Sequence, residues 1–193
     1  MKKIIDFSTK NEVKFTKEDL PILIHGKEHS GASLLSITLA VGLHEVDNRL
    51  CIFTAYPMAK EEFLKQVKNS EKVFYLENEE DFEKSLEFQT VIVQSGNIDL
   101  FIKLISNPSF VNDRIIFIKN IETIKIPILK FVSSYPLIVS GDLELNPAQQ
   151  DFKDFIYNTK IFLSSLQGEK LPTLEKYQAF IKSRSGERII VVS

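Results

Sequence analysis

The sequence has little of several features that would place it in a specialised class of protein. A single cysteine, Cys51, excludes a disulfide framework within one chain. No apolar run approaches the length of a membrane span, and the first apolar stretch is too short for a signal peptide, so we expect a cytoplasmic protein without a membrane span. Arginines are few, and a net charge of −2 with a pI near 6.0 argues against a free-standing, strongly basic nucleic-acid binder. His25 and His29 lie at a strand end and in a loop, and no cysteine or aspartate sits at ligand spacing, so no metal site is predicted.

The sequence does contain short apolar runs that alternate regularly with longer polar or amphipathic stretches. This pattern predicts an α/β fold of three layers (α/β/α), with a mainly parallel sheet covered on both faces. Residues 1–20 are expected to form a lead-in arm or an edge strand, and the length of 193 residues suits a single domain. Strands are predicted at 21–25, 50–55, 73–76, 90–93, 114–118, 136–142, 160–165 and 187–193. Helices are predicted over 30–43, 58–67, 78–88, 98–105, 124–133 and 147–157, while 174–184 is expected to be a helix or, alternatively, an edge strand.

One stretch, residues 21–43, combines a strand, a glycine-bounded loop and a helical segment that is uncharged from Ser30 to Leu43. The loop follows the phosphate-binding pattern G-x-x-x-x-G-K-[ST], in which backbone N–H groups and a helix N-terminus hold an anion. Both glycines and the hydroxyl are in register, but alanine replaces the lysine that contacts the phosphates: the loop reads Gly26-Lys27-Glu28-His29-Ser30-Gly31-Ala32-Ser33. The alternative is an ordinary βα turn, with Gly26 in the tight bend and Ser30 capping a buried helix.

With this loop in a strand–loop–helix setting, the chain resembles the P-loop NTPase superfamily, of the RecA-like (ASCE) type, with a degenerate Walker A motif. The resemblance spans about residues 20–193. It implies that any nucleotide site consists of Gly26, Lys27, Ser30, Gly31, Ala32 and Ser33, with either no cofactor or weakly bound ATP or ADP. Lys27 holds the place at which the ParA/MinD-like group carries a lysine that reaches a phosphate across a dimer interface.

The resemblance also calls for a Walker B motif, an acid at the end of an apolar strand that holds Mg²⁺. Strand 90–93 is preferred, because its spacing from Ser33 resembles that of RecA-like proteins, and it puts Gln94 at the Walker B position. Strand 114–118 is the alternative, with Lys119 at that position and Glu122 displaced from it. Neither strand supplies the acid, so the sequence predicts no catalytic residue.

The expected function is that of a RecA-like domain that has lost ATP hydrolysis and acts as a non-catalytic subunit or regulator of an ATPase or DNA-processing assembly, such as one in recombination or repair. Its partner would be an active RecA-like homologue or a second copy of the chain. A first alternative is a nucleotide-binding protein, or slow ATPase, that uses Lys27 in place of the lysine missing at Ala32. A second is a single-stranded nucleic-acid binder that uses lysines near Lys119, Lys125 and Lys130.

Overall fold

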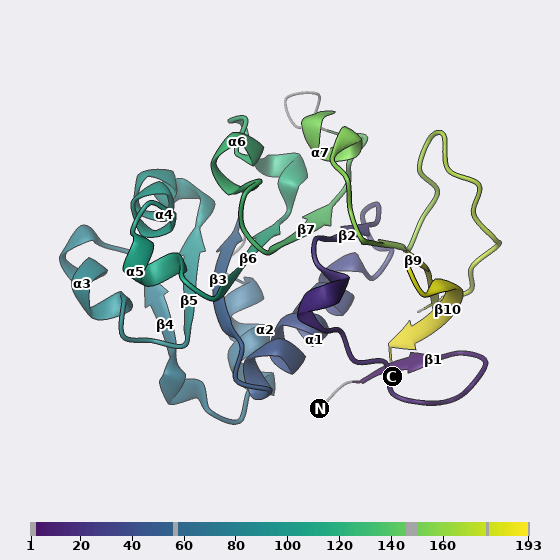
Figure 1. Cartoon of the computed structure of the whole chain (residues 1–193), viewed down its shortest axis with the longest axis horizontal. Helices are drawn as coiled ribbons and strands as arrows, with labels where there is room; N and C mark the ends of the chain where they lie inside the picture. Colours follow the sequence, from purple (N-terminus) through teal and green to yellow (C-terminus); the bar gives the residue numbers. More distant parts are fainter. Residues whose placement is uncertain (1–2, 56–57, 146–149, 177, 193) are drawn as a thin grey trace.

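A single mixed sheet runs through the whole molecule in the computed structural model (Figure 1), which describes residues 3–55, 58–145, 150–176 and 178–192. Within these ranges the sheet has ten strands in the order β1-β10-β9-β8-β2-β7-β6-β3-β5-β4. Their bounds are β1 Ile4–Asp6, β2 Ile22–His25, β3 Arg49–Thr54, β4 Val73–Leu76, β5 Thr90–Gln94, β6 Arg114–Lys119, β7 Leu137–Gly141, β8 Thr159–Phe162, β9 Gln178–Ser183 and β10 Gly186–Val192.

Strand direction divides the sheet into a parallel part and an antiparallel margin. All strands from β8 through β2 and β7 to β4 are parallel to their neighbours, whereas β9, β10 and β1 pair antiparallel. The parallel strands are continuous apolar runs, and every residue of β6 is buried, as is typical of a sheet covered on both faces. The expected mainly parallel α/β sheet is therefore confirmed.

Helices cover both faces of the sheet and form two separate cores. One core packs α1 (Ala32–Glu45) and α2 (Met58–Gln66) against the sheet. The other packs α3 (Phe82–Ser85), α4 (Ile98–Ile105), α5 (Pro108–Val111), α6 (Leu129–Val132) and α7 (Gln150–Asp154) against the opposite face. In Figure 1 these two groups of helices lie on opposite sides of the strands, which gives the three-layer arrangement.

Two predicted helices are wrong. Residues 124–133 yield only the short α6, because Pro127 lacks an N–H group and disfavours helical backbone in the residue before it. Residues 174–184 contain strand β9, which forms a hairpin with β10 across a turn at residues 184–185. β10 begins at Gly186 (φ 117°), and β9 lies inside the sheet rather than at its edge. The predicted helix 147–157 is observed as α7, but its first residues lie outside the described ranges.

The sheet order determines which loops can form a site. The carboxyl ends of the parallel strands β8, β2, β7, β6 and β3 lie side by side at one edge of the sheet. In open α/β sheets, ligands bind outside this edge. The glycine-bounded loop follows β2, so side chains at the ends of β7, β6 and β8 are its neighbours.

Candidate functional site

The loop of residues 26–33 joins β2 to α1 and ends at a helix N-terminus without a side-chain cap. The N-cap residue is Gly31, whose φ of 92° lies in the left-handed region that glycine adopts without strain, and the first turn of α1 holds no acidic residue. Ser30 does not cap the helix, contrary to the alternative βα-turn interpretation. Its hydroxyl is buried and has no hydrogen-bond partner among the described residues. The helix N-terminus is thus open to an anion.

Gly26 is required by the close packing of this loop. A Cβ at this position would collide with the Ser30 hydroxyl and would lie 2.8 Å from the Ala32 Cβ and 3.3 Å from the Leu163 Cβ. We expect Gly26→Ala to lower the free energy of unfolding by about 1–3 kcal/mol, as overpacking does. The matched control is Gly96→Ala, because a Cβ there meets nothing within 4 Å. Urea denaturation of both variants tests this, and equal effects would contradict the close packing at Gly26.

Lys119, the last residue of β6, reaches the start of α1. Its Nζ donates a hydrogen bond to the Ser33 hydroxyl over 3.3 Å, and the residue is only 2% exposed. Burial lowers the pKa of Lys119 to about 8, against the attraction of Glu62 and Glu122. Within the described ranges the ammonium makes no ion pair with a carboxylate. The start of α1 therefore has a buried cation beside the Ser33 hydroxyl.

Gln94 lies far from the loop, so the preferred assignment of the Walker B position is corrected. It ends β5, and the strands β7, β6 and β3 separate β5 from β2. Four strand spacings correspond to about 19 Å, too far for Gln94 and Ser33 to share a ligand. The position that faces Ser33 belongs to Lys119, as in the alternative assignment. Glu122 accepts a hydrogen bond from the Asp142 N–H over 3.1 Å and so is held toward the end of β7.

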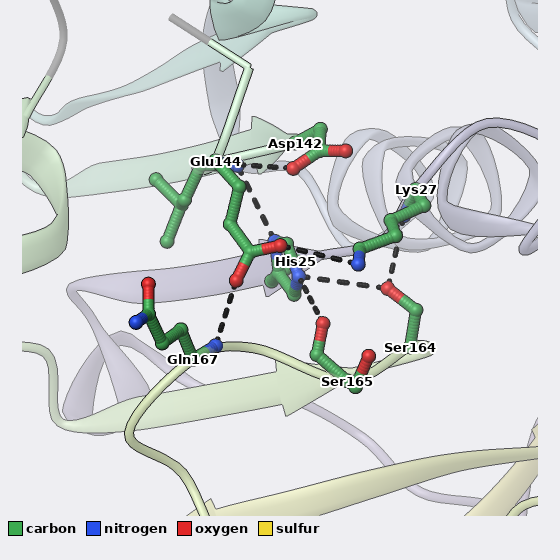
Figure 2. Close-up of polar contacts among 8 residues, drawn as sticks. His25, Lys27, Asp142, Glu144, Ser164, Ser165 and Gln167 are labelled. Carbon is green, nitrogen blue, oxygen red and sulfur yellow. Dashed lines mark hydrogen bonds and ion pairs between the residues drawn. The ribbon is translucent and has the colours of Figure 1, made fainter. Parts of the chain in front are cut away.

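Lys27 is directed toward the loops after β7 and β8 by contacts at both ends of the residue (Figure 2). Its Nζ lies 3.1 Å from Glu144 Oε2, and its backbone N–H donates to the Ser164 hydroxyl over 3.0 Å. Glu144 also accepts a hydrogen bond from the Gln167 N–H over 2.7 Å. These contacts, the Gln167 N–H first, lower the pKa of the Glu144 carboxyl. Lys27 is thus partly neutralised before any ligand arrives.

His25 is fully buried at the end of β2 and is hydrogen-bonded to the loops that follow β7 and β8 (Figure 2). Its Nδ1 accepts a hydrogen bond from the Leu143 N–H over 3.3 Å, so Nε2 carries the proton and donates to the Ser165 carbonyl over 3.1 Å. Because Nε2 is protonated, it cannot act as the base for Ser164, whose hydroxyl lies 3.5 Å away. His29 is exposed on the loop, and within the described chain no three His, Cys, Asp or Glu residues cluster as metal ligands.

Sequence reasoning missed the contact of Lys119 with Ser33 and the hydrogen bonds around His25. Lys119, Asp142 and Ser164 follow or end apolar runs, and polar residues at the carboxyl ends of parallel strands are the signal that could have indicated them. Which of those ends lie beside the loop depends on strand order, and the sequence pattern leaves that order open. Gly26, Ser30 and Gly31 lie in the loop, Ala32 and Ser33 are the first two residues of α1, and the nucleotide site that the motif predicts stays a prediction.

Comparison with known proteins shows which of them share the fold of this chain. Neither a protein-family model nor the sequence of a curated protein matches the chain. In structure, it is similar to Thermomonospora curvata EccC (ATPases 2 and 3) in complex with a signal sequence peptide, at 14% identity and a TM-score of 0.62. All of this chain is covered in that match, but it spans only 40% of the EccC chain.

Two further neighbours match over most of their own length. The genome packaging NTPase B204 from Sulfolobus turreted icosahedral virus 2, in complex with ATP-gammaS, has 15% identity and a TM-score of 0.62, over 91% of this chain and 98% of that one. The chain has the P-loop NTPase fold. The flagellar accessory protein FlaH from Methanocaldococcus jannaschii has 13% identity and a TM-score of 0.52, over 89% of this chain and 88% of that one. Over the described part of this P-loop chain, no helix combines the length and apolar character needed to cross a bilayer.

Proposed function

We propose that this chain is a P-loop domain without ATP hydrolysis, which acts as a non-catalytic subunit or regulator of an ATPase or DNA-processing assembly. The observation that carries the proposal is the ammonium of Lys119 on the Ser33 hydroxyl. In P-loop ATPases a hydroxyl at this place helps to hold Mg²⁺. A cation fixed there repels a divalent metal, and Ala32 supplies no charge to the phosphates.

The structural neighbours support a role within an assembly. One is described as a genome packaging NTPase and another as ATPases in complex with a signal sequence peptide, so both descriptions name a macromolecule or a peptide besides the nucleotide. A domain that keeps such a fold without its catalytic charges retains surfaces through which it can bind an active homologue or a second copy of itself.

The alternatives have less support from the geometry. A slow ATPase that uses Lys27 would have to break the ion pair between Lys27 and Glu144. A nucleic-acid surface that includes Lys119 would need that side chain at the surface, whereas Lys119 is buried. Lys125 and Lys130 are exposed, but two lysines provide little of the counterion release on which such binding depends.

Hydrolysis is tested by phosphate release from Mg-ATP. We expect the purified chain to release phosphate no faster than the buffer alone, and release that Lys119→Met abolishes would overturn the proposal.

The double substitution Ala32→Lys with Lys119→Asp should create Mg²⁺-dependent ATP binding, because it supplies the phosphate-binding lysine and a carboxylate beside Ser33. Its matched control is Ala32→Gln with Lys119→Asn, which changes the same positions without the charges.

The role in an assembly needs its own measurement. Purification of the tagged chain from its native cells should recover a P-loop ATPase in near-stoichiometric amount, or the chain itself as an oligomer. Light scattering on the purified protein distinguishes the oligomer from the monomer. A monomer that brings down no such ATPase would contradict this part of the proposal.

A further inference from the structure

Lys119 carries a buried side-chain amine that no carboxylate contacts. The residue is 2% exposed, and its one hydrogen bond within the described ranges goes to the neutral hydroxyl of Ser33. Glu62 and Glu122 attract it through space, but neither forms an ion pair with it. Burial without a counter-charge favours the neutral amine over the ammonium, and a neutral amine is a nucleophile.

The start of α1 also disfavours a positive charge at this place. Ser33 is the second residue of α1, so the Lys119 Nζ lies beside the positive end of the helix dipole. The first turn has no acidic side chain to offset that field, and no side chain caps the helix. A negatively charged group in place of the ammonium would therefore be stabilised, because it could accept hydrogen bonds from the uncapped N–H groups.

Lys119 also lines a narrow cleft between the sheet and the helices α1 and α2. Thr54 is the other polar residue of the lining, and the remaining side chains are apolar: Ile37, Ala40, Ile52, Phe63 and Ile92. The cleft has room for about one molecule of the size of water. A molecule that reacts with this amine must therefore be small and uncharged, which excludes phosphates, nucleotides and the active site of a modifying enzyme. Carbon dioxide is a linear, apolar electrophile of this kind.

We propose that Lys119 is a carbamylation site, at which CO₂ adds reversibly to the side-chain amine. The ammonium first loses one proton to water. Nζ then attacks the carbon of CO₂, an N–C bond forms, one π-electron pair moves onto oxygen, and the nitrogen releases a second proton. The product is a carbamate, so the charge beside Ser33 changes from positive to negative. Ser33 is exposed, which leaves space for the new carboxylate, and its hydroxyl donates a hydrogen bond to it.

This inference goes beyond the proposed function and does not depend on it. A carbamate adds a carboxylate beside Ser33, but position 32 still holds alanine, so the lysine that contacts the phosphates is missing in both states. No ATP hydrolysis is therefore expected with or without CO₂. Phosphate release measured under both conditions tests hydrolysis separately, so the two proposals can fail independently.

NMR of the purified chain with ¹³C-labelled CO₂ and bicarbonate at pH 8 tests the inference. At this pH roughly half of the Lys119 side chains are neutral, against roughly one in 250 for an exposed lysine. We expect two carbamate resonances, one from the α-amino group and one from Lys119, because these are the amines that are substantially unprotonated. The resonance of Lys119 should disappear on acidification, since a protonated amine cannot hold CO₂.

Variants assign the second resonance. Lys119→Met should lose it and keep that of the α-amino group, while Lys125→Met, which removes an exposed lysine, should keep both. Ser33→Ala should raise the CO₂ pressure for half-occupancy roughly ten-fold, because the carboxylate loses a charge-assisted hydrogen bond. The inference would be overturned by a single resonance in the unaltered chain, by two resonances in Lys119→Met, or by an unchanged half-occupancy pressure in Ser33→Ala.

Discussion

Arg114→Met is expected to lower the free energy of unfolding by about 4 kcal/mol, because the guanidinium holds together the end of the sheet opposite the loop. Arg114 is 1% exposed, and burial lowers its pKa to about 10, so it is charged at neutral pH. In place of an acid it is satisfied by backbone carbonyls, at 2.6 Å from Phe110, 2.8 Å from Gln89 and 2.8 Å from Phe88, with longer contacts to Leu50 and Leu86. Methionine fills similar space but removes every one of these donors, and of the three close acceptors the Gln89 carbonyl keeps a hydrogen bond from the Leu50 N–H.

Chemical denaturation with two further variants isolates the cause. Arg114→Lys keeps the charge, but a lysine has fewer donors than the planar arginine side chain. Its free energy of unfolding should therefore lie between that of the unaltered chain and that of Arg114→Met. Arg49→Met is the matched control, since Arg49 is exposed and lies directly opposite Arg114 in the β3–β6 pairing. A loss for Arg114→Met no larger than that for Arg49→Met would show that the carbonyl contacts contribute little.

Lys119→Met is expected to raise the free energy of unfolding by about 3 kcal/mol at pH 7, and this gain should disappear as the pH rises toward 10. The pKa of Lys119 is lowered from 10.5 to about 8 in the folded chain, so the unfolded chain holds the proton more tightly. Below pH 8 the buried charge therefore lowers stability. Between pH 8 and 10.5 the native state loses its proton first, and the cost of burying the charge diminishes.

Urea denaturation of the unaltered chain and of Lys119→Met at several pH values from 7 to 10 tests the direction of this pH dependence. The difference between the unaltered chain and Lys119→Met should shrink across that interval, whereas Lys125→Met should follow the unaltered chain throughout. Parallel stability curves for Lys119→Met and the unaltered chain would mean that the ammonium is not buried as the structure shows. Lys119→Met also changes the packing and loses the hydrogen bond to Ser33, and both changes lower its stability. The expected rise in the free energy of unfolding at pH 7 is therefore an upper value.

Much of the fold followed from the sequence because the hydrophobic pattern of a covered parallel sheet is strong. The runs that became β2, β3, β4, β5, β6, β7, β8 and β10 were all predicted as strands, within one to three residues at their ends. The predicted helices failed where a local effect opposed the pattern, as at Pro127, or where pairing decided the outcome, as in β9. A short amphipathic segment such as 174–184 fits both periodicities, and its place between β8 and β10 selected the strand.

In the candidate site too, the sequence determined some features and the tertiary structure determined others. The loop from Gly26 to Ser33, the glycines that shape it and the absence of a lysine at Ala32 were determined by the sequence alone, because they are local and adjacent along the chain. That Lys119 rather than Gln94 faces Ser33 was decided only by the tertiary structure. Strand order in a parallel sheet depends on how the crossover helices pack, which leaves little trace in any one segment. Both strands therefore remained candidates for the Walker B position until the sheet order separated them by two positions.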